Sequence, residues 1–142
     1  MLVETLDLRD AKRMIAAAEA MADSLGIAYN VAVVDAGGHL IAFLRQDHGL
    51  IGGVDLAIKK AVTARLFDKT TEFLASLAQP GRPLFGIHQS NGGDVIIFGG
   101  GIPVIRKGQV VGAVGTSSGS VEQDIAVAEA AITALGDGGL RS

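Results

Sequence analysis

Cysteine and tryptophan are missing from this 142-residue sequence, and aromatic residues make up only 4% of it. Without cysteine, the chain has no disulfide scaffold, no thiolate ligand for zinc or an iron–sulfur cluster, and no thiol nucleophile. The few aromatic side chains offer little surface on which bases or sugars could stack. Because hydrophobic residues still make up 49% of the chain, we expect a core of alanine, valine, isoleucine and leucine.

An excess of positive charge is also missing. Twelve lysines and arginines stand against fifteen acidic residues, which gives a formal net charge of −3. The basic residues are scattered, and the nearest approaches to a cluster are the pairs Lys59-Lys60 and Arg106-Lys107. Nucleic-acid-binding proteins usually present a basic patch or stripe. We therefore expect no nucleic-acid partner.

Long apolar runs are absent as well. No stretch approaches the roughly 20 apolar residues that span a bilayer, and the N-terminal residues lack the pattern of a signal peptide. We therefore expect a cytoplasmic protein with no membrane partner, folded as a single domain over residues 1–142 with a frayed tail at 137–142. The mean hydropathy of +0.41 is high for a small monomer. Apolar surface buried between subunits would explain it, so we expect a homo-oligomer.

The apolar periodicity predicts alternating blocks of helices and strands. The predicted helices cover residues 8–25, 54–67, 71–79 and 121–135. The predicted strands cover residues 30–36, 39–45, 94–98, 103–106 and 110–115. Asp7 and Gly26 suit the two ends of the first helix, and Ser120 with Gln123 has the capping-box spacing at the start of the last.

Gly37-Gly38 separates the first two predicted strands and predicts a hairpin, because both central positions of a type I′ turn have positive φ. The links between neighbouring strands are too short for parallel crossovers. The order α-β-β-α-α-β-β-β-α therefore predicts an α+β domain with a single five-stranded, mainly antiparallel sheet packed against helices.

A glycine-rich stretch, FGGGIPVIRKGQVVGAVGTSSGS, covers residues 98–120. It is not a phosphate-binding loop of the Walker type, because Gln109 stands where the lysine is required and a strand follows where a helix is needed. The dinucleotide-binding fingerprint is missing too. Gly112 and Gly115 are better explained as positions where a helix or a neighbouring subunit approaches the strand closely.

Four segments together resemble a known family: VAVVDAGGHLIAFLR, AIKKAVTARLF, FGGGIPV and VVGAVGTSSGSVEQDIAVAEAA. In this order and spacing they are similar to the GlcG/HbpS family, which includes the C-terminal domain of PduO-type proteins. The resemblance implies a profilin-like or PAS-like fold, assembly into homo-oligomers (possibly octamers), and haem or a related tetrapyrrole as ligand. Some members carry an N-terminal histidine linked to haem, whereas the first predicted helix here contains none.

The resemblance leaves the activity open. The leading hypothesis is a protein that binds a small ligand or cofactor. The alternatives are a small, cofactor-independent catabolic enzyme that acts on a carboxylated metabolite, and an accessory partner of a catabolic enzyme.

The helix AIKKAVTAR carries the first candidate site residues. Lys60 and Thr63 are i, i+3 neighbours and share a face with small residues. A lysine there could bind a carboxylate or a haem propionate, or have its pKa lowered for catalysis; it could equally snorkel at a subunit boundary. Arg45, which ends the second strand, is a second candidate for binding an anion.

Three histidines complete the candidates. No pair has the spacing of a local metal site, so we expect no bound metal ion. His48 and His88 lie on irregular segments, where ligands often bind, and His48 joins Lys60 as a candidate acid or base. His39 is expected to be a solvated strand residue. In the last helix, Glu122 and Asp124 lie in the first turn, where the helix dipole alone explains them.

Overall fold

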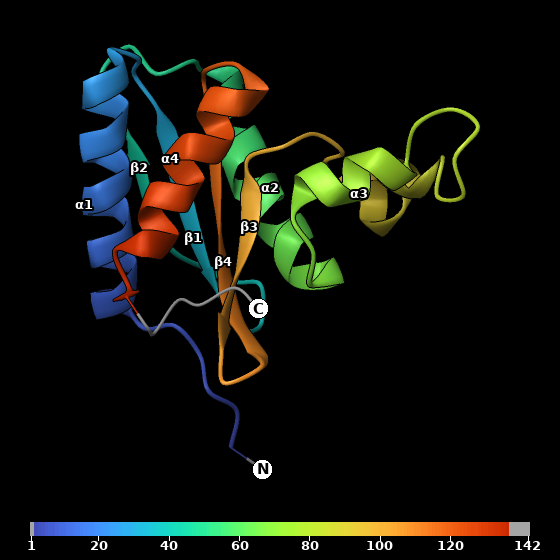
Figure 1. Cartoon of the computed structure of the whole chain (residues 1–142), viewed down its shortest axis with the longest axis horizontal. Helices are drawn as coiled ribbons and strands as arrows, with labels where there is room; N and C mark the ends of the chain where they lie inside the picture. The colour runs from blue at the N-terminus through green and yellow to red at the C-terminus, as the bar shows by residue number, and fades with distance from the viewer. Residues whose placement is uncertain (1, 137–142) are drawn as a thin grey trace.

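A computed structural model describes residues 2–136 as one antiparallel sheet with helices on both faces (Figure 1). The strand order is β2-β1-β4-β3. The strands are β1 (Asn30–Asp35), β2 (Leu40–Arg45), β3 (Gly101–Arg106) and β4 (Gln109–Ser117). Pro103 lies in β3, at the edge of the sheet, where its missing N–H disrupts no ladder on the open side.

Three long helices cover the sheet. They are α1 (Leu8–Leu25), α2 (Gly52–Phe67) and α4 (Val121–Thr133), and the shorter α3 (Thr71–Leu77) follows α2. Helices α1 and α4 lie on one face, and α2 lies on the other (Figure 1). The chain then leaves α3 as an arm, residues 79–93, which extends away from the sheet and contains the short 3-10 helices η1 (Ile87–Gln89) and η2 (Asn91–Gly93).

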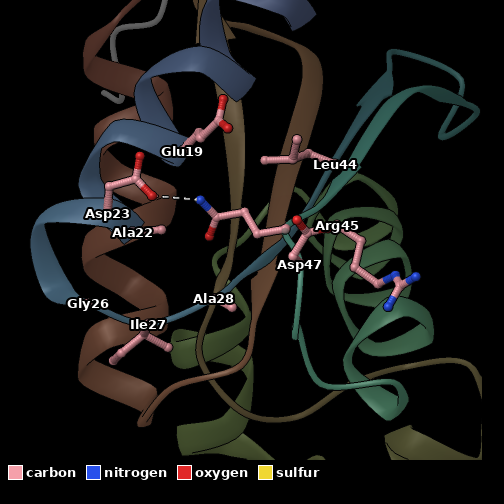
Figure 2. A pocket seen from close by; sticks show the side chains of 10 residues that line it. Glu19, Ala22, Asp23, Gly26, Ile27, Ala28, Leu44, Arg45 and Asp47 are labelled. Atoms are coloured by element: carbon pink, nitrogen blue, oxygen red, sulfur yellow. Dashed lines mark hydrogen bonds between the residues drawn. The ribbon is translucent and has the colours of Figure 1, made fainter.

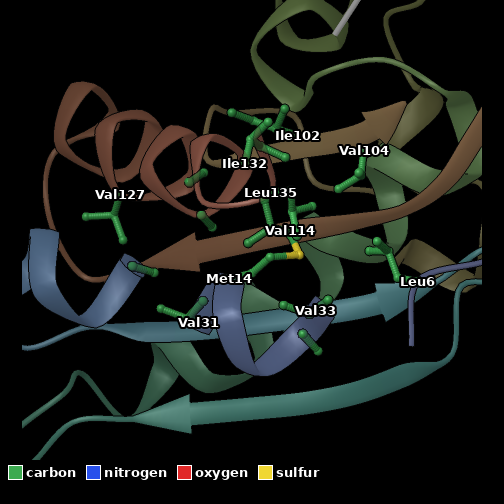
Figure 3. Packing of buried hydrophobic residues seen from close by; sticks show 14 of the residues in the cluster. Leu6, Met14, Val31, Val33, Ile102, Val104, Val114, Val127, Ile132 and Leu135 are labelled. Atoms are coloured by element: carbon green, nitrogen blue, oxygen red, sulfur yellow. The ribbon is translucent and has the colours of Figure 1, made fainter. Parts of the chain in front are cut away.

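Alternation along β1 divides the core into two layers, because successive strand residues point to opposite faces. Val31 and Val33 pack with Met14 of α1 and Val127 of α4 on one side (Figure 3). Ala32 and Val34 face α2 on the other side, where the contacting residues are mostly alanine. Burial on both faces explains why none of the central strands shows the apolar–polar alternation of a half-exposed sheet.

Small residues let α2 lie directly against the sheet. A Cβ added to Gly115 would meet the backbone oxygen of Ala57 and come within 2.5 Å of the backbone nitrogen of Ala61. Close approach of a helix, predicted for this glycine, is therefore confirmed. The added Cβ of Gly112 would meet the backbone oxygen of Val34 and the side chain of Leu6, so this position too is closed to larger residues.

Both predicted ends of α1 and the predicted start of α4 are confirmed, whereas α4 ends at Thr133, two residues before its predicted end. Asp7 and Asp10 form a capping box at the start of α1, and Gly26 ends it with φ of 71°. Ser120 and Gln123 form the predicted capping box of α4. These signals are local, so the sequence carries them without reference to the rest of the fold.

The predicted fifth strand, residues 94–98, is wrong, and the sheet has four strands over the described residues. The segment is held by a helix side chain instead of a neighbouring strand. The hydroxyl of Thr63 on α2 donates to the backbone oxygen of Asp94 (3.5 Å) and accepts from the N–H of Ile96 (3.1 Å). Because these backbone groups bond to α2, they join no ladder, and the chain enters the sheet only at Gly101.

The predicted type I′ turn at Gly37-Gly38 is also wrong, although the hairpin exists. Only Gly38 has a positive φ, of 80°. The carboxylate of Asp35 accepts from the backbone nitrogens of Gly37 and His39 and organises a longer loop. The turn between β3 and β4 has positive φ at both Lys107 (50°) and Gly108 (77°). The predicted frayed tail, 137–142, lies outside the described residues.

Candidate functional site

A fully buried lysine is the most unusual feature of the site. Lys60 lies on the face of α2 that packs against the sheet, and its exposed fraction is 0%. Its Nζ donates to the backbone oxygen of Thr116 at 2.8 Å and to Oδ2 of Asp124 at 2.9 Å. A buried charge is tolerated only when it is paired and hydrogen-bonded. Both conditions are met here.

Asp124, in the first turn of α4, is the centre of this network. Its Oδ1 accepts from the hydroxyl of Tyr29 (2.9 Å) and from the backbone nitrogen of Gly119 (3.0 Å). The hydroxyl of Thr116 donates to the backbone oxygen of the same residue at 2.6 Å. Three donors, the Lys60 ammonium, the Tyr29 hydroxyl and the Gly119 N–H, therefore converge on the Asp124 carboxylate.

Burial shifts the pKa of the two side chains that donate to Asp124, which are Lys60 and Tyr29. Desolvation lowers the pKa of Lys60, and the neighbouring Asp124 opposes that change. Desolvation, reinforced by the hydrogen bond to Asp124, raises the pKa of the Tyr29 hydroxyl. Tyr29 is therefore a proton donor over the whole physiological range, while the lysine loses its proton more readily than an exposed one.

Phe98 covers the lysine from the outside. Its ring centroid lies 5.0 Å from Nζ, in the geometry of a cation–π contact, and the side chain is 40% exposed. Lys60 is thus reached neither by a surface ligand nor by solvent while this ring is in place. The prediction that it binds a carboxylate or propionate stays a prediction, and it would require this network to open.

Sequence analysis missed Asp124 as the partner of Lys60, because the helix dipole gave a sufficient reason for a carboxylate in the first turn. A signal was present. Asp124 precedes Val127, Ala128 and Ala131 at helical spacing, and those three residues form the buried stripe of α4. An acidic residue on an apolar stripe points to a buried cation elsewhere in the chain.

Thr63 lies three residues after Lys60 and is also buried. Its hydroxyl is occupied by the backbone of Asp94 and Ile96 at the base of the arm. The structure therefore gives Thr63 a role in anchoring the chain between the arm and β3. Its predicted contact with a ligand stays a prediction.

Arg45 lies at the edge of the largest of the three cavities we consider, a hollow of about 510 Å³ between the end of α1 and the end of β2 (Figure 2). This volume is within the usual range for small-molecule sites. The lining includes three acidic residues, Glu19, Asp23 and Asp47, and one basic residue, Arg45. Figure 2 shows the arginine side chain directed away from Asp23, which is bonded to Gln46 at 3.0 Å. A ligand with two carboxylates would be repelled here.

His48 follows this acidic wall in the chain, exposed and with φ of 71°. Two smaller cavities, of about 220 and 360 Å³, lie beside the start of β3 and share Thr70 and Ile102. Neither contains a histidine in its lining. His39 is exposed in the loop between β1 and β2, where its backbone N–H donates a hydrogen bond to the carboxylate of Asp35.

His88 lies on the arm, half-buried beside Phe85, with the two ring centroids 5.9 Å apart. Its Nδ1 is buried, and among the described residues this atom has no hydrogen-bond partner. Phe85 is 58% exposed and Leu84 is 37% exposed. The arm therefore presents an imidazole next to apolar surface, which is an uncommon combination on a protein exterior.

The structure does not assemble the predicted residues into one pocket. Lys60 and Thr63 share α2 but bond to different segments, Arg45 and His48 lie at the end of β2, and His88 lies on the arm. Within residues 2–136, no group of three or more acidic, histidine or cysteine side chains is arranged to hold a metal ion. No helix in this range has both the length and the apolar character to cross a bilayer.

Comparison with known proteins gives a consistent result. Residues 6–133 match the family described as haem degrading protein HbpS-like. An uncharacterised 15.0 kDa protein from the dhaT-dhaS intergenic region of Citrobacter freundii is 39% identical over 130 residues, 92% of each chain. The crystal structure of a PduOC:heme complex is 36% identical, covers 96% of this chain and 99% of its own, and has a TM-score of 0.91. A double mutant of Streptomyces reticuli HbpS is 30% identical, covers 96% of this chain and 90% of its own, and has a TM-score of 0.86.

Proposed function

The chain belongs to the HbpS-like family, and on this basis we propose that it binds haem or a closely related tetrapyrrole. The observation that carries the proposal is the likeness to PduOC, which has been solved in complex with haem. Similarity over nearly the full length of both chains supports a common ligand more strongly than a shared fold alone would.

The residues of this chain provide a suitable iron ligand on the arm. Haem iron in proteins is held by histidine, cysteine, methionine or tyrosine. Cysteine is absent, residues 8–25 contain no histidine, and the only tyrosine, Tyr29, is buried against Asp124. Of the three histidines, His39 and His48 are exposed in loops and His88 lies half-buried in the 3-10 helix η1 on the arm, and we assign the iron ligand to His88.

Four features favour His88 over His48. The haem plane is apolar, and His88 lies beside the exposed side chains of Leu84 and Phe85. Its buried Nδ1 has no hydrogen-bond partner within the described residues. By contrast, His48 follows an acidic wall that would repel haem propionates. Arg82, exposed at the base of the arm, carries the charge that a propionate prefers.

When bound, haem iron would supply redox and dioxygen chemistry. The contribution of the chain is to hold the iron through an imidazole nitrogen and to cover one face of the ring with apolar side chains. The geometry favours ligand binding over an enzyme that acts on a carboxylated metabolite. Of the two candidate acid–base residues for such an enzyme, Lys60 is fully buried in an ion pair, and His48 is exposed outside the lining of the cavities described above.

Titration of the purified protein with hemin, followed through the Soret band, tests the proposal. We expect a Soret shift with saturable binding in the unmodified protein, and loss of that shift in His88→Ala. His39→Ala and His48→Ala are matched controls and should bind hemin normally. Absence of a Soret shift in the unmodified protein would overturn haem binding. Normal binding in His88→Ala together with loss in His48→Ala would move the iron ligand to the end of β2.

We also propose that the chain forms a homo-oligomer. Exposed apolar side chains on the arm and a mean hydropathy of +0.41 support this, because burial between subunits would remove such surface from water. A native mass spectrum of the protein as isolated would report the number of subunits and any retained haem in one measurement. A spectrum of monomers only, at micromolar concentration, would contradict the proposal.

A further inference from the structure

Lys60 is a buried amine that takes no part in the proposed binding of haem iron by His88. Thr116 and Asp124 take two of its three N–H donors. The remaining side of Nζ faces the ring of Phe98, 5.0 Å away. A cation–π contact is weaker than the two hydrogen bonds, and its ring is 40% exposed. Of the contacts that enclose the amine, this one opens most readily.

The glycine run that follows Phe98 packs directly against Lys60. Gly100 has φ of +125°, and a Cβ placed on it would lie 2.8 Å from Nζ of Lys60. Gly100 and Gly101 also line the cavity of about 220 Å³ between α3, β3 and α4. Gly100 therefore lies both against the amine and in the wall of this cavity, two residues after Phe98.

From this arrangement we propose that Lys60 captures small, uncharged aldehydes as a protonated imine, and that the aldehyde reaches Nζ when Phe98 moves off it. The size of the cavity, below the usual range for drug-sized ligands, restricts the ligand to a few heavy atoms. Glu72 and Glu129 are among its lining residues. Their charges disfavour a carboxylated carbonyl compound such as a 2-oxo acid.

The reaction needs no acid or base beyond the Lys60–Asp124 ion pair. Lys60 first passes one proton to Asp124, which leaves a neutral amine and a neutral carboxylic acid. The amine nitrogen attacks the carbonyl carbon, and transfer of a nitrogen proton to the carbonyl oxygen gives a carbinolamine. Asp124 returns its proton to the hydroxyl group, the C–O bond breaks, and water leaves. The product is a protonated imine beside an ionised carboxylate, so the lysine ammonium and aldehyde are converted to iminium and water with no change in charge.

Two properties of the network favour this reaction. Burial lowers the pKa of Lys60 and so eases formation of the nucleophilic amine. The iminium keeps the positive charge that Asp124 already neutralises, so the product leaves no unpaired charge in the core. Tyr29 and Gly119 hold the carboxylate in position through its other oxygen.

Reductive trapping with acetaldehyde and sodium cyanoborohydride at neutral pH tests the proposal, with peptide mapping by mass spectrometry to locate ethylated lysines. Lys69 is a matched internal reference, because it is exposed and also lies against a phenylalanine ring, that of Phe73, at 5.6 Å. We expect ethylation of Lys60 in the folded protein, at a temperature well below the unfolding transition. Ethylation of Lys69 without Lys60, or of Lys60 only in proportion to globally unfolded protein, would overturn the proposal.

Two variants separate gating by Phe98 from general loosening of the fold. Phe98→Ala should speed ethylation of Lys60 about tenfold, the factor that corresponds to a lost cation–π contact of about 1.4 kcal/mol. Phe73→Ala should leave the rate at Lys60 unchanged. Equal acceleration by both variants would contradict a gate at Phe98.

Glyoxylate, a carboxylated aldehyde, should label Lys60 at least several-fold more slowly than acetaldehyde, and equal labelling would overturn the preference for uncharged aldehydes.

Lys60→Arg keeps the positive charge and cannot form the imine. It should abolish the label at position 60. The two proposals therefore fail separately: loss of hemin binding in His88→Ala bears only on haem, and absence of the Lys60 label bears only on aldehyde capture.

Discussion

Replacing Lys60 by methionine would leave Asp124 as a buried charge without its cationic partner. Methionine has a similar length and no donor, so the substitution removes the 2.9 Å ion pair and the 2.8 Å hydrogen bond to Thr116 while filling the same space. The lysine side chain is 0% exposed and the aspartate side chain 5% exposed. Breaking a buried pair from one side costs about 3–5 kcal/mol. Since whole domains are stable by only about 5–15 kcal/mol, this is a large fraction of the total.

Urea unfolding followed by circular dichroism would measure this loss as a lower midpoint with an unchanged slope. Lys59→Met is the matched control: the same substitution one residue earlier, at a lysine on the solvent side of α2 that pairs with Asp55 and Asp94. We expect the control to unfold at the same urea concentration as the unmodified protein. Adding Asp124→Asn to Lys60→Met should recover part of the stability, because it removes the unpaired charge. If Lys60→Met unfolds at the same midpoint as Lys59→Met, the account of a buried, essential ion pair is refuted.

Two further predictions concern packing and pH. Gly115→Ala places a methyl group against the backbone of Ala57, so we expect a loss of about 3 kcal/mol or more in the same urea assay. Gly52→Ala, where no described atom lies within 4 Å of the new Cβ, should instead stabilise by about 0.5–1 kcal/mol. The raised pKa of Tyr29 contributes stability that is complete below the unfolded value of about 10 and is lost as the pH rises above it. The free energy of unfolding should therefore fall more steeply between about pH 10 and 11 in the unmodified protein than in Tyr29→Phe, and parallel curves would contradict the role of this hydroxyl.

Local signals in the sequence predicted most of the fold. The caps of α1 and α4 and the glycines at the hairpins act within a few residues, and the helices and first two strands were placed nearly where they lie. The fifth strand failed for a long-range reason. Residues 94–98 contain an apolar run typical of a strand, but their backbone is held by Thr63, more than thirty residues earlier in the chain.

The site was predictable only in part. Small neighbours on α2 marked Lys60 as unusual, and the structure shows it buried in an ion pair. Its partner is 64 residues away in the chain, and Tyr29 is a further long-range contact of that partner, 95 residues from it. No spacing rule connects positions so far apart. The isolated Nδ1 of His88 likewise depends on how the arm folds back on itself.

The strand order β2-β1-β4-β3 has a consequence for the order of folding events. Each outer strand is joined to its inner neighbour by a short turn, so the two hairpins can form from contacts that are local in the chain. The central seam instead pairs residues 30–35 with residues 112–117 and requires closure of a loop that contains α2, α3 and the arm. Because contacts of high sequence separation slow folding, we expect docking of the two preformed hairpins to limit the folding rate. Shortening the arm, which lies inside that loop and outside the core, would then speed folding while leaving the rate of unfolding almost unchanged.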